Sequence, residues 1–219
     1  MLLKLIASLL MLAMMGCSTV NPINTEAKHS NRLDRTISNT TPVLDNDIYE
    51  IQQNTSTIQF RVDSPVGEVW GSFHDFEGSF TMINNGASNQ SAIVDIKTKS
   101  LHVDNTLIRT ILKSESFFHI EKHPSIHFIG DSFEWFNDNN AVLKGNMTIN
   151  NVTRPVAFYV KLAKPDITNP YSERIIIKAT TTIKRSEFGI YTLLPAISDN
   201  VNLFMAIEAI KKNTTVSMM

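Results

Sequence analysis

The sequence has very little cysteine: Cys17 is the only one among 219 residues. A single thiol excludes a disulfide within the chain and a thiolate metal cluster. An excess of one charge sign is also lacking, because 20 Lys and Arg residues stand against 21 Asp and Glu residues, giving a formal net charge of −1. A nucleic-acid-binding protein of this size would carry a basic excess. We therefore expect no nucleic-acid partner.

Signatures of common enzyme classes are missing too. The chain has no G-x-S-x-G elbow, no phosphate-binding loop and no Gly-rich dinucleotide turn. His119, His123 and His127 are spaced as metal ligands on one helix would be, but Pro124 interrupts any such helix, and the run from Ser125 alternates like a strand. We therefore expect surface histidines, no metal, no cofactor and no catalytic residue. We therefore expect that the protein is not an enzyme. The alternative is an enzyme or a metal protein that uses these histidines.

Long apolar runs are scarce, and the run at the N-terminus is short. It has the length of the core of a secretory signal, whereas a membrane-spanning helix needs about 20 apolar residues. The run ends in Met-Met-Gly-Cys at residues 14–17, which resembles the bacterial lipobox, in which the cysteine is diacylated. This resemblance implies that residues 1–16 are a lipoprotein signal peptide and that Cys17 anchors an exported protein to a membrane. Because Ser18 rather than Asp follows, it implies the periplasmic side of a Gram-negative outer membrane. The alternative is an ordinary signal peptide with an incidental cysteine.

The rest of the chain divides into a polar stretch and a patterned body. Residues 17–46 are rich in Asn, Thr and Ser without sustained periodicity, which predicts a flexible tether. Residues 47–213 are expected to form one folded domain. Within it, apolar and polar residues alternate with the period of a β-strand. The alternating runs are 58–62, 69–73, 94–96, 126–128, 143–149, 156–162, 175–183 and 201–209.

Turn signals separate these runs, at 84–86, 137–140, 150–151 and 165–170. Short connections predict antiparallel neighbours. About eight such strands either close into a barrel or stack as a sandwich, and a barrel of this size is filled by side chains or holds one small ligand. A transmembrane barrel is disfavoured, because it needs strands of about 9–11 residues and several runs are shorter.

One segment departs from the strand pattern. Between Asn105 and Phe118, the apolar residues Leu107, Ile108, Ile111 and Leu112 follow helical spacing. We predict one short helix that covers an end of the sheet structure. It is either a lid over a ligand or a plug that fills core.

The order of several motifs resembles the YceI-like family of lipocalin-like, polyisoprenoid-binding bacterial periplasmic proteins. The resemblance spans roughly residues 49–210. No single motif is specific, but their order and spacing are. The motifs are Val69-x-Gly71-x-Phe73-x-x-Phe76-x-Gly78-x-Phe80, Asn105-x-x-x-Arg109-x-x-Leu112-Lys113-Ser114, His123-Pro124-x-Ile126-x-Phe128, Gly145-x-Met147-Thr148-Ile149-x-x-x-Thr153-Arg154-Pro155-Val156 and Arg185-x-x-Phe188-Gly189. The sequence departs from the family at Asp63, where His is common, at Thr110, where Asp is usual, and at Asn151, where the hairpin has Gly.

The resemblance implies an all-β fold, an eight-stranded antiparallel lipocalin-like barrel with the helix over one end. It implies a long apolar ligand inside, an isoprenoid quinone or a polyprenyl lipid, which the protein sequesters or carries in the periplasm. Arg109 and Lys113 are candidates to meet its headgroup at the mouth of the tunnel, and the alternative is that both are solvated surface charges. The candidates to line the ligand, each with plain core packing as the alternative, are Phe60, Val62, Phe73, Phe76, Phe80, Phe117, Phe118, Phe128, Met147, Phe158 and Met205.

A second function remains open: an envelope lipoprotein with a filled core and no ligand, which binds a partner through its outer surface. The aromatic residues Trp70, Tyr159 and Phe204 on otherwise polar strand faces motivate it. The sequence leaves the oligomeric state open, a homodimer included.

Overall fold

A computed structural model of the chain describes residues 46–83, 91–163 and 173–212. The predicted signal peptide, Cys17, the tether apart from Asn46 and the predicted turns at 84–86 and 165–170 lie outside the described residues. The strands are β1 (Asn46–Ile51), β2 (Thr57–Ser64), β3 (Gly67–Phe73), β4 (Phe76–Ile83), β5 (Ser91–Lys97), β6 (Leu101–His102), β7 (Ser125–Asn137), β8 (Asn140–Ile149), β9 (Val152–Ala163), β10 (Arg174–Lys184) and β11 (Asn200–Lys211). The described part also holds the helix α1 (Thr106–Lys113) and the 3-10 turns η1 (Gln53–Thr55), η2 (Thr98–Ser100) and η3 (Arg185–Phe188).

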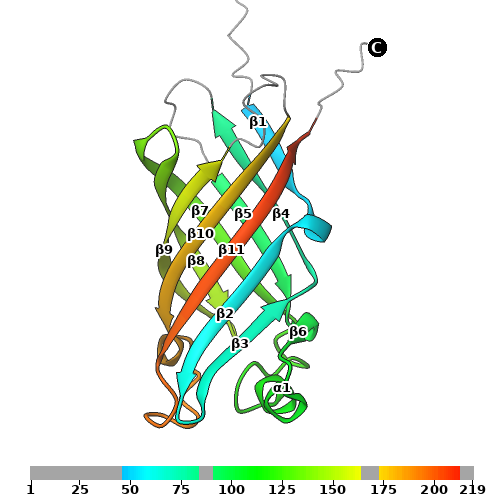
Figure 1. Cartoon of the computed structure of the whole chain (residues 1–219), viewed down its shortest axis with the longest axis vertical. Helices are drawn as coiled ribbons and strands as arrows, with labels where there is room; N and C mark the ends of the chain where they lie inside the picture. Colours follow the sequence, from blue (N-terminus) through cyan, green and yellow to red (C-terminus); the bar gives the residue numbers. More distant parts are fainter. Residues whose placement is uncertain (1–45, 84–90, 164–172, 213–219) are drawn as a thin grey trace, which may run out of the picture. The chain divides into compact units, whose positions relative to one another are not determined.

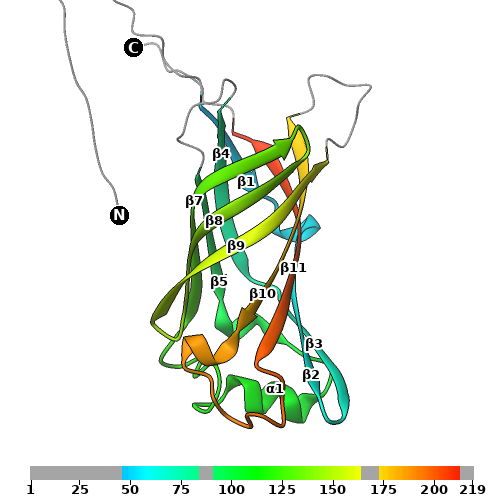
Figure 2. The same ribbon diagram turned by 90° about the vertical axis from the view of Figure 1, so that its left-hand side faces the viewer.

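The strands form a closed antiparallel barrel, as Figures 1 and 2 show. The sheet runs in the order β1-β4-β5-β7-β8-β9-β10-β11, and β1 closes it by pairing with β11 as well as with β4. All pairings are antiparallel, and most neighbours are consecutive in the chain, as the short predicted connections require. The predicted fold class, an eight-stranded antiparallel barrel with one helix, is confirmed.

Two positions in the barrel wall are each occupied by a broken strand. The first half of β11 pairs with β2 and its last residues pair with β1, so β1 and β2 together form one position, interrupted by η1. β3 and β4 likewise pair with β2 and β1 in turn, and are interrupted at His74 and Asp75. One edge of β3 pairs with β2, and its other edge pairs with the two-residue strand β6. The sheet is therefore least continuous at the end where β6 lies, and α1 lies at the same end.

Inward-facing residues are apolar and outward-facing residues are polar, so the predicted alternation is a core pattern. β9 shows it most clearly, because Val156, Phe158, Val160 and Leu162 are buried while the residues between them are exposed. Burial of such faces provides the main driving force for closing the barrel.

The connection between β8 and β9 shows how the local sequence sets the register. Asn150 and Asn151 form a two-residue turn with φ of 51° and 61°, between the paired residues Ile149 and Val152. Asn tolerates this left-handed conformation better than other non-glycine residues. Asn151 therefore adopts the left-handed conformation at the position where the family pattern has the hairpin glycine.

The helix covers one end of the barrel but is shorter than the predicted segment 105–118. The Asn105 side chain caps it by accepting from the backbone N–H groups of Leu107 and Ile108, at 2.9 and 3.1 Å. It ends at Lys113, because the Ser114 hydroxyl and N–H both donate to the Ile111 carbonyl. The chain then passes through turns to β7, and the four apolar residues on which the helix was predicted all lie within α1.

Candidate binding cavity

An apolar space of about 410 Å³ lies at the α1 end of the barrel. Its wall is almost entirely hydrocarbon. Five parts of the chain build it: the inward faces of β2, β3, β5, β7, β8, β10 and β11, the β2–β3 turn, the apolar face of α1, the segment after α1, and residues 185–197. Pockets that hold one small molecule span about 300–1,000 Å³. We refer to this space as the outer cavity.

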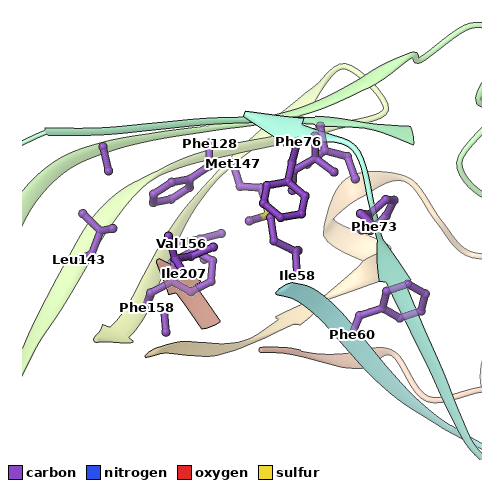
Figure 3. Close-up of a cluster of buried hydrophobic side chains, with 14 of the residues drawn as sticks. Ile58, Phe60, Phe73, Phe76, Phe128, Leu143, Met147, Val156, Phe158 and Ile207 are labelled. Atoms are coloured by element: carbon purple, nitrogen blue, oxygen red, sulfur yellow. The ribbon is translucent and has the colours of Figure 1, made fainter. Parts of the chain in front are cut away.

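A second apolar space of about 60 Å³ lies deeper along the barrel and is called the inner cavity here. The two share four wall residues, Ile96, Ile126, Met147 and Met205. In Figure 3, Met147 lies between the Phe128 and Phe158 rings on one side and Phe60 and Phe73 on the other. Methionine side chains are flexible and adapt to irregular surroundings. Two of the four residues that separate the cavities, Met147 and Met205, therefore have flexible side chains.

The predicted lining residues separate into four groups. Met147 and Met205 line both cavities, and Phe80, Phe128 and Phe158 line the inner one. Phe76 lines neither, because its buried ring packs within the core. The residues that line the outer cavity are Phe60, Val62, Phe73, Phe117 and Phe118.

The two predicted headgroup residues lie on α1 but outside the walls of both cavities. The Lys113 ammonium donates to the Lys99 carbonyl at 2.8 Å. The Arg109 guanidinium donates to the Thr106 hydroxyl at 3.2 Å and lies 3.4 Å from His102 Nδ1. Both cations thus have partners within the chain on the outer side of the helix.

Arg185 is a charged wall residue for which the sequence analysis predicted no role. Its side chain lines the outer cavity, is only 5% exposed, and donates to four backbone carbonyls. The acceptors are Ile190 (3.0 Å), Thr192 (2.8 Å), Ile197 (3.0 Å) and Ser198 (2.9 Å). Desolvation lowers the pKa of Arg185, although the negative charge of Asp199 opposes this shift.

Arg185 thus stabilises the loop between η3 and β11, because its side chain donates to four carbonyls of that loop. The Arg-x-x-Phe-Gly motif marked this position in the sequence. The role of Arg185 depends on carbonyls up to 13 residues away, which no local pattern predicts.

The outer cavity opens at the α1 end. Val66 in the turn between β2 and β3, Ile111 on α1 and Leu193 in the 190–197 loop all line the cavity and are also exposed to solvent. A side chain that contacts both solvent and the cavity marks the boundary between them. A guest would therefore enter between these three segments.

The chemistry that this site offers is solvation of hydrocarbon. Within residues 46–83, 91–163 and 173–212, no group of three or more His, Cys, Asp or Glu side chains is placed to hold a metal ion. His119 and His123 contact each other edge to face, with ring centroids 5.8 Å apart, whereas His127 pairs with Asp95 on the outer face. In the described part of the chain, no helix combines the length and the apolar character needed to cross a membrane.

The size of the outer cavity is itself an argument for a guest. Apolar volume left unfilled in a protein core costs stability through lost packing. The wall of the outer cavity leaves about 410 Å³ free of side chains. A core selected only for stability would fill this space with side chains.

Comparisons with known proteins agree with this architecture. A sequence profile described as the YceI-like domain matches residues 49–209. A UPF0312 protein of Pectobacterium atrosepticum is 31% identical over 157 residues, which cover 71% of this chain and 81% of the relative.

Two solved structures share the fold. BcnA of Burkholderia cenocepacia aligns with a TM-score of 0.66 at 17% identity, covering 72% of this chain and 98% of its own. A domain of Saccharophagus degradans, described as polyisoprenoid-binding and implicated in plant cell wall breakdown, aligns with a TM-score of 0.58 at 11% identity, covering 75% and 98%. At these identities the two structures establish the fold of the barrel.

Proposed function

This chain belongs to the YceI-like family, and on that basis we propose that its barrel binds the hydrocarbon chain of an isoprenoid lipid, such as a quinone or a polyprenyl compound. The observation that carries the proposal is the outer cavity, an apolar space of about 410 Å³ that opens at the α1 end. The polyisoprenoid-binding domain of Saccharophagus degradans, which has the same fold, supports the choice of an isoprenoid.

The energetics of the cavity favour a long apolar chain over a polar ligand. Each CH₂ group that leaves water contributes about 0.8 kcal/mol, so a dozen buried carbons supply roughly 10 kcal/mol before the costs of association. The buried charged residue of the described wall is Arg185, and four of its five N–H donors already bond backbone carbonyls, so little in this wall replaces the water of a polar ligand. Specificity for the chain would come from the shape of the wall.

We propose a location as well. The signal-like N-terminus and Cys17 support an exported protein, anchored by acylation of that cysteine on the periplasmic side of the outer membrane. Metabolic labelling with a tagged fatty acid tests this: the full chain should become labelled and a Cys17→Ser variant should not. An unlabelled wild-type chain would remove the anchor from the proposal.

The ligand itself is tested by extraction. We expect organic solvent to release an isoprenoid lipid from the purified full chain, identified by mass spectrometry. Val69→Trp places an indole in the outer cavity and should abolish this signal, whereas Lys178→Trp, on the exposed face of β10, should retain it. A wild-type protein that yields no lipid and takes up no added quinone would refute the proposed function.

The alternative of a filled core with a binding outer surface has one observation in its favour. Trp70 and Phe204 stack on the outer face with centroids 5.5 Å apart, and Arg61 lies 5.9 Å from the Trp70 ring. Trp70 and Arg61 also both bond Glu68, at 3.1 and 3.0 Å. The aromatic pair is thus tied into a local network, while the barrel interior contains the void that a filled core excludes.

A further inference from the structure

Exposed apolar side chains gather at the end of the barrel where the outer cavity opens. The side chains are Val66 (89% exposed), Leu107 (69%), Ile111 (40%), Tyr191 (65%) and Leu193 (54%). They come from three segments far apart in the sequence: the β2–β3 turn, α1 and the loop after η3. Figures 1 and 2 show all three segments at the same end of the barrel. We call these five residues the apolar rim.

The apolar rim is continuous with the cavity wall. Val66, Ile111 and Leu193 belong to both, so hydrocarbon surface extends without interruption from solvent to the barrel interior. The helix shows the same arrangement on its own, since none of its residues is fully buried even though Ile108, Ile111 and Leu112 face the cavity. Such a surface is costly in water unless something apolar covers it.

The rim is held in place by hydrogen bonds rather than left to move independently. The buried Arg185 guanidinium binds the carbonyls of Ile190, Thr192 and Ile197, on both sides of Leu193. The Thr192 hydroxyl donates to the Ser116 carbonyl at 2.8 Å, which ties the loop to the segment after α1. The Ser198 N–H donates to the Asp63 carbonyl at 2.9 Å, which ties it to the end of β2.

Leu193 adds evidence from backbone conformation. Its φ is 62°, in the left-handed region, where a bulky non-glycine residue is a rare outlier. A non-glycine residue in this region is strained, and such strain gathers at functional sites. The fold thus tolerates strain at a residue whose exposed apolar side chain borders the cavity.

We propose that the apolar rim docks onto the surface of a lipid bilayer, so that the chain of a membrane lipid passes between bilayer and cavity without crossing water. The reason for a bilayer is the continuity of rim and cavity, because a cargo that dissolves in membranes is collected where it dissolves. A second copy of the chain fits less well, because seated on the rim it would close the mouth through which the cargo passes. The inference rests on the proposed function, and vesicle binding and lipid content are measured separately so that the two can fail independently.

Vesicle binding tests this inference. The chain from residue 18 onward, which lacks both the apolar N-terminal run and the acylation site, is sedimented with vesicles of neutral phosphatidylcholine. The rim variant adds Leu107→Asp and Tyr191→Asp, at two exposed rim positions outside the cavity wall. The matched control adds Ile129→Asp and Phe136→Asp, which are 54% and 66% exposed on β7. We expect the rim variant to lose about tenfold or more in partitioning and the control to partition like the parent.

Three outcomes would overturn the inference: a parent that does not sediment with vesicles, equal losses in the rim variant and the control, or a parent dimer that the rim substitutions dissociate. Lipid content is measured on the same preparations. A rim variant that keeps its lipid while losing vesicle binding supports docking. A parent that binds vesicles but contains no lipid refutes only the proposed function.

Discussion

At the scale of single residues, the cavity wall depends on one glycine. Gly71 lies directly across the ladder from Phe60, and a Cβ atom there would overlap the Phe60 ring. Because Phe60 borders the outer cavity, a ring displaced by such a Cβ atom would move into the cavity. The glycine of the V-x-G-x-F motif therefore leaves room for the Phe60 ring against β3, and the cavity beside the ring stays open.

Replacing this glycine tests that role. Gly71→Ala should push the Phe60 ring into the outer cavity, lower affinity for an added isoprenoid and reduce the free energy of unfolding by about 1–3 kcal/mol. Denaturant titration and ligand titration measure the two effects. The double variant Gly71→Ala with Phe60→Leu should recover binding. A Gly71→Ala protein with undiminished affinity would contradict this assignment.

The loop after η3 has an acid-sensitive support in Asp199. Burial opposes ionisation of its carboxylate, but hydrogen bonds from the Ser186 hydroxyl (2.7 Å) and N–H (2.9 Å), together with the charge of Arg185, outweigh burial and lower the pKa of Asp199 below 3.8. A lowered pKa stabilises the fold at every pH above the ordinary value and loses that contribution as pH falls through the folded value.

We therefore expect the stability of the wild-type chain to decrease below about pH 4, and Asp199→Asn to be less stable at pH 7 with a flatter acid dependence. Glu187→Gln, at an exposed position on the same turn, should leave the acid dependence unchanged. Thermal unfolding across pH measures this. Parallel curves for wild type and Asp199→Asn would rule out this role of Asp199.

The alternation of apolar and polar residues in the sequence distinguishes inward-facing from outward-facing positions. It does not distinguish buried residues that line a cavity from buried residues that pack in the core. Phe73 and Phe76 stand in the same motif and are both buried, yet only Phe73 borders a cavity. The difference lies in which strands face each ring across the barrel, which depends on closure. The role of Arg185 escaped the sequence reasoning for the same reason.

At the scale of elements, α1 contributes to the cavity without being buried itself. Its side chains reach only partial burial, so its stability rests more on its cap than that of a core helix does. The sequence predicted this helix from the spacing of its apolar residues, and predicted the strands from alternation. It did not predict the breaks at η1 and at His74–Asp75, because apolar alternation continues on both sides of each break.

Removing the cap should loosen the helix specifically. Asn105→Ala deletes the acceptor for two helix N–H groups, which costs about 0.5–2 kcal/mol. Amide exchange in α1 and release of bound isoprenoid should both accelerate, while exchange in the barrel strands stays unchanged. Asn105→Asp, which keeps a capping oxygen, should behave like wild type. Unchanged exchange in α1 after loss of the cap would show that packing alone holds the helix.

At the scale of the whole molecule, the barrel is divided into an outer and an inner cavity, and the partition includes Met147 and Met205. This division predicts how affinity depends on chain length. Short chains fill the outer cavity, and longer ones gain further only when the methionines move aside. No sequence pattern reveals the partition, because it depends on side chains from opposite walls meeting near the axis.

Opening the partition should extend the range of chain lengths that are bound. In a series of prenols, affinity for the wild type should level off at a shorter chain than affinity for Met205→Ala, which joins the cavities at a cost of about 2–5 kcal/mol in stability. Leu143→Ala enlarges only the inner cavity and should keep the wild-type limit. Identical limits for wild type and Met205→Ala would show that the methionines set no boundary.

The central claim, that the closed barrel holds one isoprenoid chain, is tested most directly by native mass spectrometry of the intact chain purified from cells that make it. The account predicts a non-covalent one-to-one adduct whose mass excess is that of an isoprenoid lipid, present in the wild type and absent from Val69→Trp. A wild-type spectrum with the bare protein mass alone, unchanged after incubation with quinones or polyprenyl lipids, would contradict it.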